Sequence, residues 1–144
     1  MNRGEEASMS ETLLGTAGEA AVLAVLTSMG IPCYMSFGDG HTADLIAEIG
    51  GAPRRLQVKS CGDSSATVRF RLAKRRRKGW AAYTDIDYFA LYSSYYNRIL
   101  LVPHTPGKKQ INVRFRETSW SKKTDIRAED VDVCKVLEDL ENGI

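Results

Sequence analysis

The sequence predicts a single mixed α/β domain, because strand-like segments fill the middle of the chain and helix-like segments lie towards both ends. With 144 residues, 43% of them hydrophobic and 26% charged, the chain is long enough for one sizeable core and too short for two. We therefore expect one domain over residues 1–144. No apolar run reaches membrane-spanning length, and the first residues lack the basic-then-apolar layout of a signal peptide, which predicts a cytoplasmic protein.

The first predicted element is a helix over residues 9–29. Ser8 and Glu11 have the spacing of a capping box, apolar residues recur at helical spacing, and Gly30 ends the element. Glu19 lies on the same face as several of these apolar residues, so its side chain could point along the sheet instead of into water. The alternative is an ordinary surface glutamate at the margin of an amphipathic helix.

Three strands are expected after this helix, over residues 33–37, 42–49 and 54–60. Glycine-rich turns separate them, so they are predicted to form a meander. The remaining expected elements are an extended segment, a helix, three strands and an acidic C-terminal helix, over residues 67–72, 73–82, 87–92, 98–102, 110–115 and 128–141, respectively.

The most informative residues lie on the second and third expected strands. On a strand, Gln57 and Lys59 project from one face and Val58 projects from the other. Asp44 stands at the head of an apolar stretch, where a buried carboxylate requires a partner. If the two strands are neighbours, these groups suit the binding of a divalent cation and the activation of water against a phosphodiester. The alternative is a solvated strand face.

Charge is unevenly distributed along the chain. Residues 125–144 carry seven acidic and two basic side chains, whereas residues 1–124 carry 18 basic and 11 acidic ones. Seven basic residues fall within ten positions: Arg69, Arg71, Lys74, Arg75, Arg76, Arg77 and Lys78. Such a cluster, followed at once by Trp80 and Tyr83, is typical of a surface that binds nucleic acid and offers aromatics for stacking. A solvated helix face or a disordered basic loop is the alternative.

Cysteine and histidine give weaker signals. Cys33, Cys61 and Cys134 are odd in number and widely spaced, which supports neither a disulfide framework nor a zinc site. His41 and His104 are candidate bases, but a lone histidine in a loop rich in Gly or Pro is usually just exposed.

The motifs described above resemble those of the PD-(D/E)XK nuclease superfamily. Glu19 on the first helix, Asp44 on the second strand and the motif from Gln57 to Lys59 on the third have its order and spacing, and the resemblance covers residues 14–115. Within the superfamily the chain is most similar to the group I intron-encoded homing endonucleases, whose third motif also begins with Gln. The resemblance implies a restriction-endonuclease-like fold with a mixed central sheet.

The resemblance also implies a role for each site residue. Asp44 is the expected ligand of Mg²⁺, or of Mn²⁺, and Gln57, the Val58 carbonyl and Glu19 are expected to complete the oxygen shell. Lys59 is expected to orient or deprotonate the attacking water and to offset charge in the transition state. Gln57 departs from the acidic residue of the superfamily consensus and adds no charge, so metal affinity is expected to rest on the two carboxylates.

The activity implied by the resemblance is metal-dependent, homing-type cleavage of double-stranded DNA, with the basic cluster holding phosphates. Two other functions remain open: a structure-selective nuclease such as a Holliday-junction resolvase, and a catalytically silent DNA-binding module of the same fold. A homo-oligomer, either a dimer or a tetramer, is expected because two symmetry-related sites are the simplest means of cutting both strands of a duplex.

Overall fold

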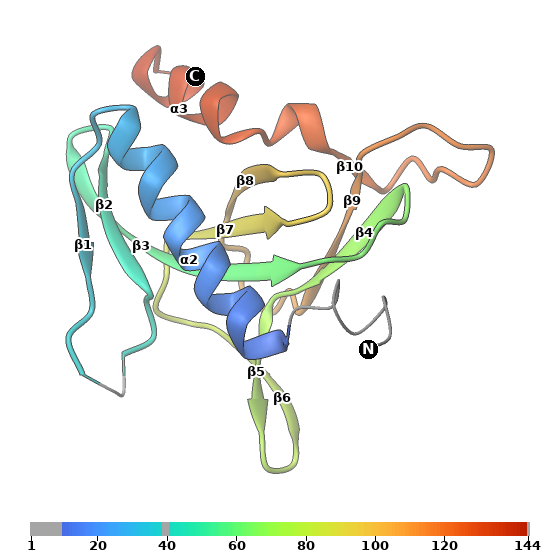
Figure 1. The fold of residues 1–144 in the computed structure, drawn as a ribbon, viewed down its shortest axis with the longest axis horizontal. Coiled ribbons are helices and arrows are strands. Elements are labelled where there is room, and N and C mark those ends of the chain that lie inside the picture. The colour runs from blue at the N-terminus through green and yellow to red at the C-terminus, as the bar shows by residue number, and fades with distance from the viewer. Residues whose placement is uncertain (1–9, 39–40, 144) are drawn as a thin grey trace, which may run out of the picture.

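In the computed structural model, which describes residues 10–38 and 41–143, a long helix crosses one face of a five-stranded sheet (Figure 1). The helix, α2, spans Glu11–Ser28. In the spatial order β1-β2-β3-β7-β8, the strands span Cys33–Met35, Leu45–Ile49, Ala52–Cys61, Tyr88–Ser93 and Arg98–Pro103. Strands β3 and β7 run parallel and the other neighbours run antiparallel, so the mixed central sheet predicted from the sequence is confirmed.

The other strands form two smaller sheets. A three-stranded sheet has the order β10-β9-β4, with the strands spanning Ile126–Arg127, Gln110–Arg114 and Thr67–Arg71. A separate hairpin consists of β5 (Ala73–Arg76) and β6 (Gly79–Ala82). This hairpin projects at the bottom of Figure 1, while the C-terminal helix α3 (Val133–Glu141) lies at the top.

Two hydrophobic cores lie on opposite faces of the five-stranded sheet. On one face, α2 and α3 pack over β3 and its neighbours, including Leu56 and Val58. On the other face, the three-stranded sheet packs against Phe89 and Leu91 of β7. Because β7 is buried on both faces, it carries a nearly continuous apolar run, whereas β3 alternates apolar and polar residues.

A two-residue turn at Gly50 and Gly51 sets the pairing of β2 with β3. Both glycines have positive φ, 64° and 79°, as the central residues of the tightest hairpin turns require. The turn pairs Ile49 with Ala52 and, further along, Leu45 with Leu56. The residue that precedes β2 is therefore carried to the middle of β3.

Helix α2 lies unusually close to β3 at Gly18. A Cβ atom at this position would lie only 1.9 Å from the Ser60 hydroxyl oxygen, so glycine alone allows the approach. The Ser60 hydroxyl is buried and has no hydrogen-bond partner among the described residues, an arrangement that costs about 1–3 kcal/mol.

The helix predicted over residues 73–82 is wrong, because this segment forms the β5–β6 hairpin. Its Ala, Lys and Arg residues are good helix formers. In the hairpin, however, Arg75 lies opposite Trp80 with its guanidinium 5.2 Å from the ring centroid, and Ala73 and Tyr83 anchor the base in the core. Cross-strand stacking and burial at the base outweigh local propensity.

The N-terminal helix begins two residues later than predicted. Ser10 is its N-cap, and the Ser10 side chain accepts a hydrogen bond from the Leu13 N–H. Ser8, which was expected to form a capping box with Glu11, lies outside the described residues.

The acidic C-terminal helix is shorter than the predicted 128–141. A single 3₁₀ turn spans Ala128–Asp130, and α3 starts at Val133, where the Asp132 side chain caps it by accepting from the Cys134 N–H. Within the described part of the chain, neither α2 nor α3 combines the length and apolar character needed to cross a membrane.

Candidate active site

The candidate site is built around Asp44, which lies immediately before β2. One carboxylate oxygen, Oδ2, accepts a hydrogen bond from the Val58 N–H at 2.9 Å, and the Asp44 N–H donates to the Leu56 carbonyl at 2.9 Å. The N–H and C=O of one strand residue point toward the same neighbouring strand, so the Val58 carbonyl also faces the edge where Asp44 lies. The Asp44 carboxylate and the Val58 carbonyl thus lie on the same side of β3, where the β2–β3 ladder ends.

Glu19 of α2 joins Asp44 at this edge. Burial raises the pKa of the Glu19 carboxyl, and the negative charge of Asp44 and a hydrogen bond between the two carboxyl groups raise it further. Both residues line a pocket of about 250 Å³, together with His41. The close approach of α2 at the preceding Gly18 brings Glu19 within reach of the sheet edge.

Lys59 is the residue of β3 that follows Val58, whose N–H donates to Asp44. Its ammonium donates a hydrogen bond to the Tyr83 hydroxyl oxygen at 2.7 Å and sits 4.7 Å from the centroid of the Tyr83 ring. Burial lowers the pKa of Lys59, the negative charge of Asp44 opposes that shift, and the positive charge of Lys74 adds to it. The lysine is therefore close enough to Asp44 for the two charges to influence each other.

Tyr83 is predicted from the sequence only as an aromatic beside the basic cluster, and not as a partner of Lys59. It follows β6, is 7% exposed, and packs edge-on against Phe89 with ring centroids 5.7 Å apart. Burial, and then the charge of Asp44, raise the pKa of Tyr83 to about 12, so its hydroxyl is neutral and available to Lys59. No sequence spacing reveals this contact, because it forms only when the hairpin folds back onto β3.

Gln57 is half-buried on β3 between Leu56 and Val58, the two residues whose backbone Asp44 contacts, and the Gln57 amide makes no hydrogen bond to any described residue. Among residues 10–38 and 41–143, no three side chains of His, Cys, Asp or Glu are grouped so as to hold a metal ion. Glu19, Asp44, Gln57 and the Val58 carbonyl stay the predicted ligands of a metal ion.

This set of residues fits a hard divalent cation. All the candidate donors are oxygens, which Mg²⁺ and Mn²⁺ prefer. Burial and then the negative charge of Asp44 raise the pKa of Glu19, and a cation bound between the two carboxylates would oppose both effects.

The two histidines differ in their relation to the site. The His41 Nε2 atom lies 2.7 Å from the Phe37 carbonyl oxygen, and its ring borders the acidic pocket. The His104 Nε2 atom lies 2.7 Å from the Tyr83 carbonyl oxygen, so the His104 ring contacts the backbone of the residue that binds Lys59. A catalytic role for His41 remains a prediction.

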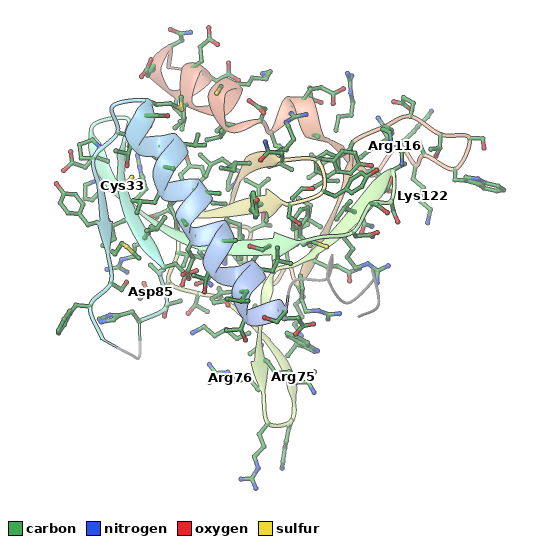
Figure 2. All side chains as sticks on the ribbon, viewed as in Figure 1. Cys33, Arg75, Arg76, Asp85, Arg116 and Lys122 are labelled. Atoms are coloured by element: carbon green, nitrogen blue, oxygen red, sulfur yellow. The ribbon has the colours of Figure 1, made fainter. Side chains whose placement is uncertain are left out.

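The structure divides the basic cluster between two elements. Arg69 and Arg71 are exposed on β4, whereas the other five basic residues lie on the β5–β6 hairpin, from which Arg75 and Arg76 project in Figure 2. A groove of about 530 Å³ joins the two regions to the site, because Lys59, Arg71 and Trp80 all line it. The groove therefore connects the basic cluster with Lys59.

A mixed sheet that brings together a helix glutamate, an aspartate before one strand and a lysine on the next is the core of a PD-(D/E)XK nuclease. A family model for the PD-(D/E)XK endonucleases matches residues 9–133, and the chain belongs to this family. The predicted superfamily is thereby confirmed, and the chain is a nuclease.

A solved structure supports the fold. The bacterial homing endonuclease I-Ssp6803I is similar to this chain with a TM-score of 0.68 and 18% sequence identity, over 94% of each chain. No curated protein matches the sequence. The predicted fold class is confirmed by this similarity.

Proposed function

We propose that the protein is a metal-dependent endonuclease that hydrolyses phosphodiester bonds in double-stranded DNA. The observation that carries the proposal is that Asp44 and Glu19 line one pocket where the β2–β3 ladder ends, within electrostatic reach of Lys59. Mg²⁺, or Mn²⁺, would be held by these two carboxylates, the Gln57 amide and the Val58 carbonyl. When bound, the cation would lower the pKa of a water and offset charge on the scissile phosphate.

Lys59 has the position and the contacts of a group that acts on the attacking water. Tyr83 accepts one of its three ammonium protons, and the Ala73 carbonyl oxygen lies 3.5 Å away. Since Lys59 also lines the basic groove, a remaining proton is available to a water or phosphate oxygen there. In that position the ammonium orients the water and offsets charge developing at phosphorus.

The arginines of the groove are suited to hold the substrate. Arg71 lines the groove with its guanidinium 4.3 Å from the centroid of Trp80, and it is in none of the ion pairs between described residues. A stacked guanidinium is restricted in orientation and is well suited to bidentate pairing with acceptor oxygens of DNA. DNA entering the groove would therefore place its backbone beside Lys59.

We further propose a homing-type enzyme that acts in the cytoplasm as a dimer or tetramer. The similar fold of a bacterial homing endonuclease supports the type of enzyme. The oligomer is proposed because the described residues of one chain form a single such site, and cutting both strands of a duplex calls for two.

A cleavage assay tests the proposed activity. Purified protein would be incubated with long linear duplex DNA, single-stranded DNA and a four-way junction, each with Mg²⁺, Mn²⁺ or EDTA. We expect cutting of the duplex that depends on metal, and at most a trace of it with Asp44→Asn. Cutting confined to the junction would replace the proposal with a structure-selective nuclease. DNA binding without cleavage in either metal would indicate a silent module.

Metal binding is tested without relying on activity. Mg²⁺ is expected to raise the melting temperature of the parent protein and to leave that of Asp44→Asn unchanged, because the variant keeps the shape of the side chain and loses the anion. Equal shifts in both proteins would place the cation elsewhere.

A further inference from the structure

The strand pair β4–β9 presents a polar face to the outside of the molecule. On β4, Val68 and Phe70 are buried in the core while Arg69 between them is exposed. On β9, Ile111 and Val113 are buried in the same core. Because side chains alternate along a strand, the residues between the buried ones all point outward.

The register aligns these outward residues in pairs. Residues directly opposite each other on antiparallel strands share a face of the sheet. The pairs are Thr67 with Arg114, Arg69 with Asn112, and Arg71 with Gln110. We call these six residues the ribbon face.

Four residues of the ribbon face have polar groups with no hydrogen-bond or ion-pair partner among the described residues, and one of them, Arg71, is stacked on Trp80 through the face of its guanidinium. Arg114 is not one of the four, since it forms an ion pair with Glu117 at 3.2 Å and donates to the Lys122 carbonyl. Among the described residues, no ion pair or side-chain hydrogen bond involves the four inner members of the ribbon face, which are Arg69, Arg71, Gln110 and Asn112. The two guanidinium groups therefore form a row on β4, and the two carboxamides form a neighbouring row on β9.

The ribbon face continues the groove that contains Lys59. Arg69 lines that groove and also a second hollow of about 540 Å³, whose lining includes Asn112, Trp120 and Lys122. In Figure 2, Lys122 lies beside the far ends of β4 and β9, across the molecule from Arg75 and Arg76 of the hairpin. A duplex held at Lys59 and extending along β4 would therefore pass over the ribbon face.

The chemistry of these rows suits base edges better than phosphates. Phosphate contacts alone carry no sequence information, and both arginine and carboxamide side chains make them, so base contacts are indicated by how these two residue types are combined and by the ribbon shape. Arginine pairs in bidentate fashion with guanine O6 and N7, asparagine and glutamine pair with adenine N6 and N7, and a two-stranded β-ribbon fits the major groove.

We propose that the ribbon face reads DNA sequence in the major groove, with Arg69 and Asn112 contacting one base pair or its neighbour and Arg71 and Gln110 contacting the next. The proposal rests on the proposed function, of which it names the specificity determinants. The hairpin then supplies affinity without sequence information, and the ribbon face supplies the preference.

A binding selection tests the ribbon face separately from cleavage. A library of random duplexes would be selected for binding in EDTA, first with the parent protein and then with Asn112→Ala. The parent is expected to enrich one motif. The variant is expected to lose the preference at one or two adjacent base pairs, with discrimination there falling about 5- to 100-fold, while other positions of the motif stay as they were.

Two matched lysine variants separate charge from geometry. Arg69→Lys keeps the positive charge and loses the bidentate fork, so it is expected to relax the preference at one position with an unchanged salt dependence. Arg76→Lys in the hairpin is the control and is expected to keep the whole motif. Circular dichroism and melting temperature would establish that all variants are folded.

Three results would overturn the proposal: no motif enriched by the parent, the parent motif retained in both ribbon variants, or the Arg76→Lys control losing the preference instead. Because the selection contains no divalent metal, these results do not depend on whether the protein cleaves DNA. Failure of the proposed nuclease activity would be seen in the cleavage assay alone.

Discussion

The proposed active site of Glu19, Asp44 and Lys59 lies where the β2–β3 ladder ends, and we call it the catalytic edge. It differs from the β5–β6 hairpin in how far its charged groups are exposed to water. At the edge, Glu19 and Lys59 are half-buried, and burial is the largest cause of the shift in each pKa. On the hairpin, Arg75, Arg76 and Arg77 are exposed, and none forms an ion pair with a described residue. The edge holds charges at a cost in solvation, whereas the hairpin leaves its charges hydrated.

This difference separates two tasks of a nuclease. Charges in a partly dehydrated site interact strongly with a cation or a reacting phosphate, because water screens them less. Exposed charges interact weakly and at long range, and salt reduces their effect. Substitutions at the edge should therefore affect turnover, and substitutions on the hairpin should affect binding and its salt dependence.

The largest expected effect comes from Lys59. Lys59→Ala should lower kcat by about 10²–10³-fold at saturating metal, because the group that orients the water is lost. Lys59→Met, which keeps the apolar stem against Tyr83, should fall equally and so exclude lost packing as the cause. Dissociation constants for DNA, measured by fluorescence anisotropy, should change little in either variant. Turnover at the parent rate would place the active site elsewhere.

The hairpin gives the next largest effect. Replacing Arg75, Arg76 and Arg77 together with Ala should weaken DNA binding roughly 10- to 100-fold at moderate salt. The slope of log affinity against log salt should become shallower by about two to three units, since each lost phosphate contact removes about one. Single-turnover rates at saturating DNA should stay close to those of the parent. An unaltered slope would assign these arginines to solubility.

A smaller effect is expected where the two regions touch. Tyr83→Phe keeps the ring beneath the Lys59 ammonium and removes the acceptor at 2.7 Å, so we expect kcat to fall about tenfold with KM for DNA unchanged. Loss of an acceptor also lowers the pKa of the ammonium, so the alkaline loss of activity should begin at lower pH. Tyr88→Phe is the control. If both variants behave alike, Tyr83 has a packing role only.

The smallest expected effect concerns stability. The folded-state pKa of Glu19 is raised above its ordinary value of 4.5, so the stability it contributes is present below about that pH and is lost as pH rises through the raised value. In metal-free protein at neutral pH, Glu19→Gln should therefore melt a few degrees above the parent, and the gain should vanish near pH 4. A gain independent of pH would contradict repulsion between the carboxylates.

The catalytic edge could be predicted because its determinants are local in sequence. Alternation along β3 separates Gln57 and Lys59 from Val58, and a two-glycine turn returns the chain so that Asp44 meets the same strand. Both features follow from strand geometry and turn chemistry over fewer than twenty residues.

Neither the β5–β6 hairpin nor the contact between Tyr83 and Lys59 could be predicted from the sequence, and the physical reason is the same for both. Local propensity favours a helix over residues 73–82, and only burial of Ala73 and Tyr83 in the core, together with stacking across the hairpin, reverses it. The pairing of β4 with β9 spans about forty residues, so nothing in the local pattern places Arg69 opposite Asn112.

The close packing of Gly18 against Ser60 sets how near α2 lies to β3, and therefore where Glu19 is placed in the proposed active site. A Cβ atom at position 18 requires either that the Ser60 side chain rotates away or that α2 moves away from β3, and in the second case Glu19 moves with the helix because it is the next residue. In the proposed nuclease, a larger residue at this buried position is therefore expected to lower cleavage through the placement of Glu19. Gly18 lies on α2 and outside the ribbon face, so such a change should leave the proposed sequence preference intact.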